Sequence, residues 1–142
     1  MILPDLNLLV YAYNSDAPGH RRAKAWWESC LSEIRPVGLP WVVILGYLRL
    51  TTSRRVLVDP FTTPESLGHI RSWLERPQVQ ILQPGSRHLD LLGSLLQDSQ
   101  ASGDLTTDVH LAALAIEHQA ELNTNDGDFS RFPGLRWTNP LL

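Results

Sequence analysis

Short apolar segments of strand length alternate with longer segments of helical periodicity along most of the chain. This alternation favours an α/β fold with a mostly parallel central sheet and helices on both faces. In folds of this class the ligand lies beyond the carboxyl ends of the strands. Strands are predicted at residues 2–4, 36–39, 79–82, 120–123 and 135–137.

Capping signals place the helices between these strands. Helices are predicted over about residues 5–13, 17–34, 41–51, 63–74, 86–99 and 106–119. Pro40 suits the first turn of the third helix, and Thr63 suits the cap of the fourth, with Glu65 in its first turn. Thr106 or Thr107 is predicted to cap the last helix.

The length of 142 residues is that of one ordinary domain, so we expect residues 1–142 to form a single unit. No low-complexity block or repeat interrupts the chain, which is 43% hydrophobic and 19% charged. Cys30 is the only cysteine, so an internal disulfide and a cysteine-rich zinc site are excluded. No apolar run reaches the ~20 residues of a membrane helix, and we expect a cytoplasmic protein with no membrane association.

The net charge of −3 argues against a protein that coats DNA non-specifically through a positive surface. This net charge does not exclude an RNA-binding function, because basic residues gather locally in the sequence. Arg21, Arg22, Lys24 and Arg49 are the candidate RNA contacts, and the alternative is that they belong to ordinary solvated helix faces.

Three acidic positions lie far apart in the sequence but at comparable places in the predicted fold. Asp5 follows the first strand, Asp126 follows a late strand, and Asp108 opens the last helix. Carboxylates gathered at one edge of a sheet repel one another and lose hydration, so a fold that keeps them together needs a neutralising cation. The pattern therefore predicts a divalent metal site.

Each acid also has a simpler structural interpretation. Asp5 suits a helix cap, Asp108 suits the positive end of a helix dipole, and Asp126 suits an Asn-Asp-Gly turn. A calcium loop is excluded, because placing Gly127 sixth puts Leu122 first and a proline twelfth. A haloacid-dehalogenase phosphatase fits poorly, since its second aspartate is here replaced by asparagine.

Taken together, four segments resemble the PIN domain of VapC-type toxins, and the resemblance covers nearly the whole chain. The matching segments are Asp5–Ala12, Leu39–Val43, Thr107–Ala115 and Thr124–Trp137.

The resemblance implies a Mg²⁺- or Mn²⁺-dependent endoribonuclease, the toxin half of a type II toxin–antitoxin pair, that cuts structured RNA such as tRNA or rRNA. It also implies a homodimer and inhibition by a cognate VapB-type antitoxin. The motif match assigns catalysis and metal binding to Asp5, Asp108 and Asp126, further metal binding to Asp128, and supporting roles to Asn7 and Thr124.

One position departs from the family pattern. Members commonly carry a further acid, usually Glu, on the helix after the second strand, and the matching position here is Gly46. A glycine inside a helix costs about 1 kcal/mol relative to alanine, so its presence requires a reason such as close packing. Asp104 and Asp128 are candidate substitutes for the missing acid. The alternative function is a catalytically impaired module that binds RNA or antitoxin.

Overall fold

The computed structural model describes residues 1–99 and 103–142, with the side chain of residue 104 left undescribed. These residues form a five-stranded sheet in the order β3-β2-β1-β4-β5, in which every pairing is parallel. The strands are β1 (Ile2–Pro4), β2 (Val37–Pro40), β3 (Val79–Leu82), β4 (Glu121–Asn123) and β5 (Trp137–Thr138).

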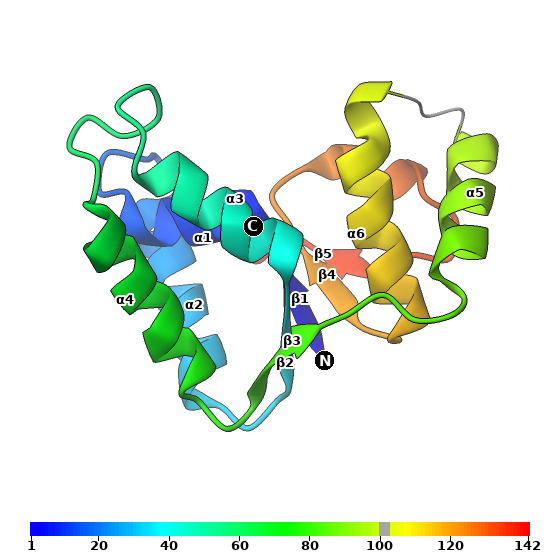
Figure 1. Ribbon diagram of the computed structural model, residues 1–142, viewed down its shortest axis with the longest axis horizontal. Helices are drawn as coiled ribbons and strands as arrows, with labels where there is room; N and C mark the ends of the chain where they lie inside the picture. Colours follow the sequence, from blue (N-terminus) through cyan, green and yellow to red (C-terminus); the bar gives the residue numbers. More distant parts are fainter. Residues whose placement is uncertain (100–102) are drawn as a thin grey trace.

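Helices cover the sheet on two sides, as predicted. The helices α1, α2, α3 and α4 gather on one side of the sheet, while α5 and α6 lie on the other (Figure 1). Their bounds are α1 Leu6–Tyr13, α2 His20–Ser32, α3 Trp41–Thr51, α4 Thr63–Leu74, α5 His88–Ser99 and α6 Thr106–Glu117, with short 3₁₀ turns η1 Gly103–Leu105 and η2 Gly127–Arg131.

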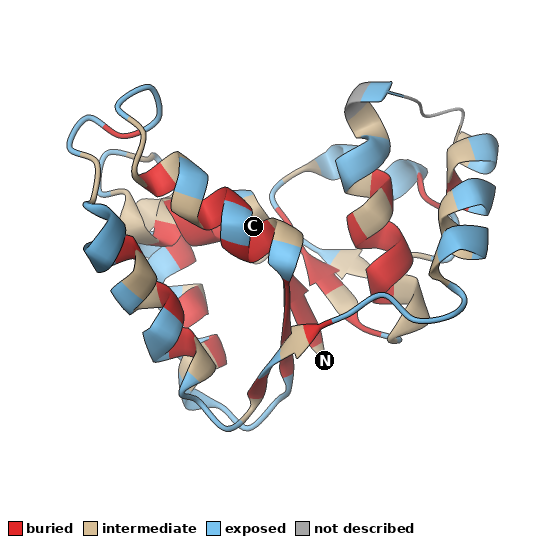
Figure 2. Ribbon diagram, viewed as in Figure 1, coloured by how far each residue is buried: buried red, intermediate tan, exposed pale blue. Residues whose placement is uncertain are grey.

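The core lies between the sheet and these helices. All residues of β1 and β2 are buried, which is typical of parallel strands with both faces covered. Figure 2 shows the buried residues concentrated on the strands and on the sheet-facing sides of α1, α3 and α6. Among the described residues, no helix is long and apolar enough to cross a membrane.

The helices α2 and α5 begin at His20 and His88, later than predicted, and the capping of three further helices differs from the expectation. Pro40 ends β2 and takes an extended conformation as the N-cap of α3, rather than lying inside its first turn. Thr62, not Thr63, caps α4, because its hydroxyl and Glu65 form a reciprocal capping box. Leu105 precedes α6 through η1, so neither Thr106 nor Thr107 is its N-cap.

The parallel register brings distant segments together at the carboxyl edge of the sheet. Pro4 of β1 lies opposite Asn123 of β4. The pairing continues one residue further, since the Asp5 backbone N–H donates to the Asn123 carbonyl at 2.8 Å. The residues that follow β1 and β4 are therefore neighbours, although nearly the whole chain separates them.

Candidate functional site

A pocket of about 150 Å³ lies at this carboxyl edge. It receives side chains from the ends of β1 and β4 and from the first turns of α1, α3 and α6. Three of the predicted acids thus line one space. The lining residues are Asp5, Leu6, Asn7, Val42, Val43, Thr107, Asp108, Leu111 and Asp126.

Asp5 is the buried member of the group, at 8% exposure. It is the N-cap of α1, and its Oδ1 accepts a 2.7 Å hydrogen bond from the Leu6 backbone N–H. Burial raises the pKa of its carboxyl, the bonds from Thr124 and Leu6 oppose that rise, and the charge of Asp126 adds to it. The cap interpretation is therefore confirmed for this residue, which also lines the pocket.

Thr124 joins two of the acids. Its hydroxyl donates to Asp5 Oδ2 at 2.7 Å and accepts from the Asp126 backbone N–H at 3.0 Å. The residue is fully buried, and its bond to Asp5 is shielded from water. Asp126 in turn caps η2, where its Oδ1 accepts from the Asp128 backbone N–H at 2.9 Å. The supporting role predicted for Thr124 thus has a geometric basis.

Asp108 lies in the first turn of α6 and is half-buried. Within the described part of the chain, no hydrogen bond or ion pair reaches its carboxylate. Burial raises the pKa of this carboxyl, and the neighbouring charges of Asp5 and Asp126 raise it further. An unpaired carboxylate that faces two other acids is the arrangement that a cation stabilises.

The amino-terminal turns of α1, α3 and α6 all border the pocket. Each helix start carries a partial positive charge and backbone N–H groups without helical partners. These helix ends offset part of the repulsion among the carboxylates. They also favour an anion such as a phosphate group at the mouth of the pocket.

The remaining predicted site residues differ in their placement. Asn7 is exposed and lines the pocket beside Asp5. Asp128 is not among the lining residues; its carboxylate, 69% exposed, lies 3.8 Å from the Arg131 guanidinium. Asp128 is nevertheless near enough for its charge to raise the pKa of Asp108, and Arg131 lowers it.

Gly46 lies in the middle of α3 beneath the side chain of Leu6. A Cβ atom at this position would lie 2.4 Å from Leu6 Cδ2. The close packing considered for this glycine is therefore observed. Leu6 occupies the space into which a side chain at position 46 would extend. Of the two possible substitutes for the missing acid, Asp128 points to Arg131, and the Asp104 side chain lies outside the described residues.

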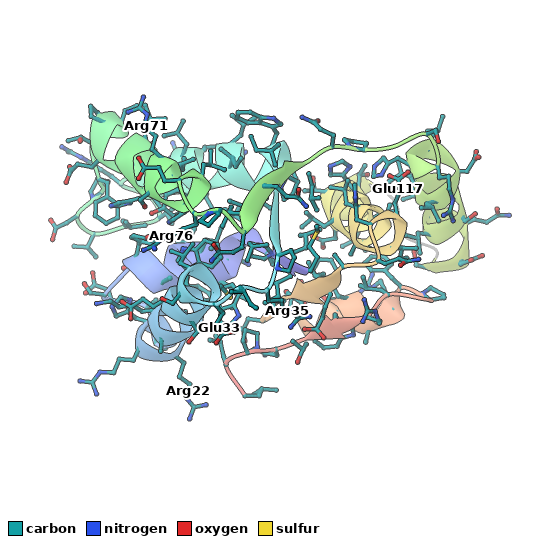
Figure 3. All side chains as sticks on the ribbon, turned by 90° about the horizontal axis from the view of Figure 1, so that it is seen from below. Arg22, Glu33, Arg35, Arg71, Arg76 and Glu117 are labelled. Carbon is teal, nitrogen blue, oxygen red and sulfur yellow. The ribbon has the colours of Figure 1, made fainter. Side chains whose placement is uncertain are left out.

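The candidate RNA contacts do not form one patch. Arg22 donates to the Leu141 carbonyl at 2.6 Å, and Figure 3 shows it on the opposite side of the molecule from Glu117. Lys24 lines a separate cavity between α1 and α2, and Arg21 is exposed on α2. Arg49 alone lies beside the acidic pocket, where it lines an adjoining recess with Leu6.

Several lining residues were not predicted. Val42 and Val43 enter the pocket from the first turn of α3, and Leu111 enters from α6 one turn after Asp108. Leu111 could have been found because it shares the helical stripe of Asp108, and the valines because they belong to the Leu39–Val43 segment of the family resemblance. The two valines come from a segment with no polar residue to mark it.

The donor chemistry of the pocket fits a hard divalent cation. Carboxylate oxygens are the ligands that Mg²⁺ prefers, and Mg²⁺ commonly keeps several waters while binding one or two carboxylates. Within residues 1–99 and 103–142, no group of three or more His, Cys, Asp or Glu side chains is arranged to hold a metal by itself.

Comparison with known proteins places the chain in a family. The PIN domain model matches residues 2–135. Ribonuclease VapC33 of Mycobacterium tuberculosis is 45% identical over 141 residues, which is 99% of each chain. This chain belongs to the VapC family of PIN-domain proteins. Ribonuclease VapC37 of M. tuberculosis is 35% identical and spans 99% of this chain and 97% of its own length.

Solved VapC-family structures share the fold at lower sequence identity. VapBC2 from Rickettsia felis, solved bound to a DNA fragment from its promoter, matches with a TM-score of 0.71 and 20% identity over 98% of both chains. M. tuberculosis VapC20, described as a sarcin-ricin loop cleaving toxin, matches with a TM-score of 0.66 and 18% identity over 96% of this chain and 99% of that one. The expected PIN-like α/β architecture is confirmed.

Proposed function

We propose that this VapC-family chain is a metal-dependent endoribonuclease, the toxin component of a type II toxin–antitoxin pair. Its reaction is the hydrolysis of phosphodiester bonds in structured RNA of the tRNA or rRNA class. The observation that carries the proposal is the convergence of Asp5, Asp108 and Asp126 on one pocket at the carboxyl edge of the sheet. The match of the PIN model to residues 2–135 supports treating residues 1–142 as one domain.

Asp5, Asp108 and Asp126 are the proposed ligands of Mg²⁺ or Mn²⁺, with Asp128 as an outer acid. PIN-domain nucleases generally use divalent metals. A bound ion supplies a water of lowered pKa as nucleophile and neutralises charge on the phosphate. Each oxygen of Asp5 keeps a free lone pair after its one protein hydrogen bond, so the carboxylate is held in orientation and can still bind an ion.

The alternative of a catalytically impaired module rests on the missing acid at Gly46. Three carboxylates remain in the pocket, which is enough for an open Mg²⁺ site. The names of the relatives also favour a ribonuclease, since VapC33 and VapC37 both carry that description. The impaired module is therefore the weaker hypothesis.

A VapB-type antitoxin is the proposed inhibitor. VapBC complexes are among the solved structures that share this fold. Arginine pairs bidentately with carboxylates. The Asp108 carboxylate has no hydrogen-bond donor among the described residues, so it is available to an arginine of the antitoxin. The cytoplasm, where RNA targets and antitoxin meet, is the proposed location, and a single buried free cysteine is compatible with it.

We also propose a homodimer that shares an RNA-binding groove. Trp41 is 47% exposed and Leu45, one turn later on α3, is 59% exposed. Large apolar side chains on one helix face beside a catalytic pocket favour burial against another protein surface. Sedimentation of the purified chain and of its Trp41→Ser variant tests this, since the variant should shift toward the monomer.

The experiment that tests the activity maps RNA ends in total RNA treated with the purified chain, freed of antitoxin. Defined new ends should form with Mg²⁺ or Mn²⁺ and disappear when a chelator is added. Asp5→Asn and Asp108→Asn should each abolish cleavage while circular dichroism shows a folded protein.

Asp90→Asn is the matched control. Asp90 also lies in the first turn of a helix, α5, but it is exposed and outside the pocket, so its loss should leave cleavage unchanged. Full activity in both pocket variants would overturn the assignment of the site.

A further inference from the structure

A second hollow adjoins the acidic pocket. This recess has a volume of about 470 Å³ and is bordered by residues of α1, α3 and the start of α6. It is defined by Leu6, Val42, Leu45, Gly46, Arg49 and Thr107.

The recess and the acidic pocket lie side by side. Leu6, Val42 and Thr107 line both of them. A group that occupies the recess therefore lies next to whatever occupies the acidic pocket. If a scissile phosphate is held at the carboxylates, as the proposed function requires, the recess receives the nucleotide beside it.

The chemistry of the recess differs from that of the pocket. No acid lines it, so it does not extend the metal site. Its walls are aliphatic apart from the Thr107 hydroxyl and the Arg49 guanidinium. Arg49 is exposed and has no ion-pair partner in the part of the chain that the structure describes. Aliphatic side chains beside an unpaired guanidinium suit a flat, partly polar, electron-rich group such as a nucleobase, because arginine stacks on nucleobases.

Gly46 controls the depth of this recess. Leu6 lies against the glycine so closely that a Cβ there would approach its terminal methyl to 2.4 Å. That methyl is the far end of a flexible side chain, so a larger residue at position 46 would be accommodated by moving Leu6 rather than the backbone. Leu6 lines both hollows, so its displacement would reshape the wall that they share.

We propose that the recess is a base-binding subsite, in which one unpaired nucleobase beside the scissile phosphate lies on Leu6, Val42 and Gly46 with Arg49 stacked against it. This inference rests on the proposed ribonuclease function and adds a determinant of substrate choice. Gly46 serves here as the residue that keeps the subsite open, at the position where the family resemblance led us to expect an acid.

The test uses a short RNA that contains a mapped cleavage site. Each nucleotide flanking the cut is replaced in turn by an abasic ribose, and kcat/KM is measured with the full chain. For the wild-type chain, removal of the base at one flanking position should lower kcat/KM about tenfold or more, the usual size of a base-stacking contribution. Removal of bases further away should have little effect.

Three variants connect this effect to the recess. In Gly46→Leu the natural and abasic RNAs should be cleaved at similar rates, and in Arg49→Gln the difference between them should shrink severalfold. Gly68→Leu is the matched control, because Gly68 is an exposed glycine of helix α4 with nothing within 4 Å of an added Cβ. It should discriminate like the wild type.

A binding measurement tests the subsite without relying on catalytic turnover or on the correct folding of Gly46→Leu. In the Asp108→Asn background, fluorescence anisotropy should show weaker binding of the abasic RNA, and Arg49→Gln should reduce that difference. Circular dichroism verifies that every variant is folded.

The outcomes separate the two hypotheses. No metal-dependent cleavage of any RNA by the wild-type chain would overturn the proposed function and the subsite with it. Cleavage that is insensitive to every flanking base would overturn the subsite alone. If the variants at Gly46 and Arg49 change only the sedimentation of the chain or its affinity for antitoxin, the recess binds a protein partner. That result would also overturn the base-binding subsite.

Discussion

The hydroxyl of Thr124 donates a 2.7 Å hydrogen bond to Asp5 Oδ2 across 119 positions of sequence. The Thr124 hydroxyl oxygen also accepts a 3.0 Å hydrogen bond from the Asp126 backbone N–H. One buried hydroxyl therefore fixes two of the three pocket acids relative to each other. The parallel register of β1 and β4 makes the contact possible, because it brings the residues after both strands to one edge.

Thr124→Val should lower both the stability of the fold and the rate of RNA cleavage. Valine keeps the shape but leaves one buried oxygen of Asp5 and the partly buried N–H of Asp126 without their partner, which costs about 1–3 kcal/mol of unfolding free energy. Urea unfolding measures this loss, and RNA cleavage should fall with it. Thr124→Ser restores the hydroxyl and should recover most of the cleavage. A valine variant with wild-type stability and activity would show that the bridge has no role.

Asp108→Asn should stabilise the metal-free chain near neutral pH. Burial and the charges of Asp5 and Asp126 raise the pKa of Asp108, so the folded state holds its proton more tightly than the unfolded state. For such a group the stability of the wild type declines as the pH rises from the ordinary Asp pKa, about 3.9, through the raised folded value. The advantage of the amide should therefore vanish as the pH falls toward 4.

Thermal unfolding across pH measures this effect, with Asp90→Asn as the exposed control. Saturating Mg²⁺ should reverse the order, because only the wild-type carboxylate gains from the ion. The explanation fails if Asp108→Asn is less stable than the wild type at neutral pH without metal.

Glu117→Gln should loosen the loop between β3 and α5. The Glu117 carboxylate accepts from the backbone N–H groups of Gly85 at 2.7 Å and Arg87 at 3.0 Å, and Figure 3 shows it where α6 faces α5. The bond from Gly85 is the main cause of a lowered pKa at Glu117, so its stabilising effect is present above the ordinary Glu pKa and is lost as the pH falls through the lowered value.

Amide hydrogen exchange at Gly85 and Arg87 should accelerate in Glu117→Gln near neutral pH, and the difference in thermal stability from the wild type should shrink in acid. Gly85→Ala should act in the same way, because a Cβ there would lie 2.6 Å from Glu117 Oε2. Unchanged exchange in both variants would argue against this anchor.

Gly46→Ala and Gly68→Ala should differ although both replace a glycine within a helix. At the exposed Gly68, alanine should stabilise the chain by up to about 1 kcal/mol through helix propensity. At Gly46 the gain should be smaller, since Leu6 has to move. In a Leu6→Ala background the obstructing side chain is absent. Adding Gly46→Ala to that background should therefore give the full stabilisation expected from helix propensity. Denaturant unfolding of the four variants measures this coupling, and strict additivity would contradict it.

Most of the fold could be predicted from local patterns. The buried strand Ile2–Pro4 and the helix that Asp5 caps follow from an apolar run and a capping residue, signals contained in a few neighbouring positions. The errors at Thr62 and Leu105 are shifts of one or two residues, where two adjacent residues compete for the same cap. Capping geometry depends on backbone angles that the residue types alone do not set.

Residue types and their spacing were enough to predict which carboxylates stand at the carboxyl edge, because strand ends and helix starts are local features. How those carboxylates are used depends on the three-dimensional packing. It placed Asp126 in the pocket and turned Asp128 toward Arg131, and it laid Leu6 over Gly46 to leave a recess beside the acids. The Asp128–Arg131 pair is a local i,i+3 contact, whereas the other outcomes depend on the packing of α1 against α3 and on the register of β1 and β4. Such long-range packing is not encoded in any single segment.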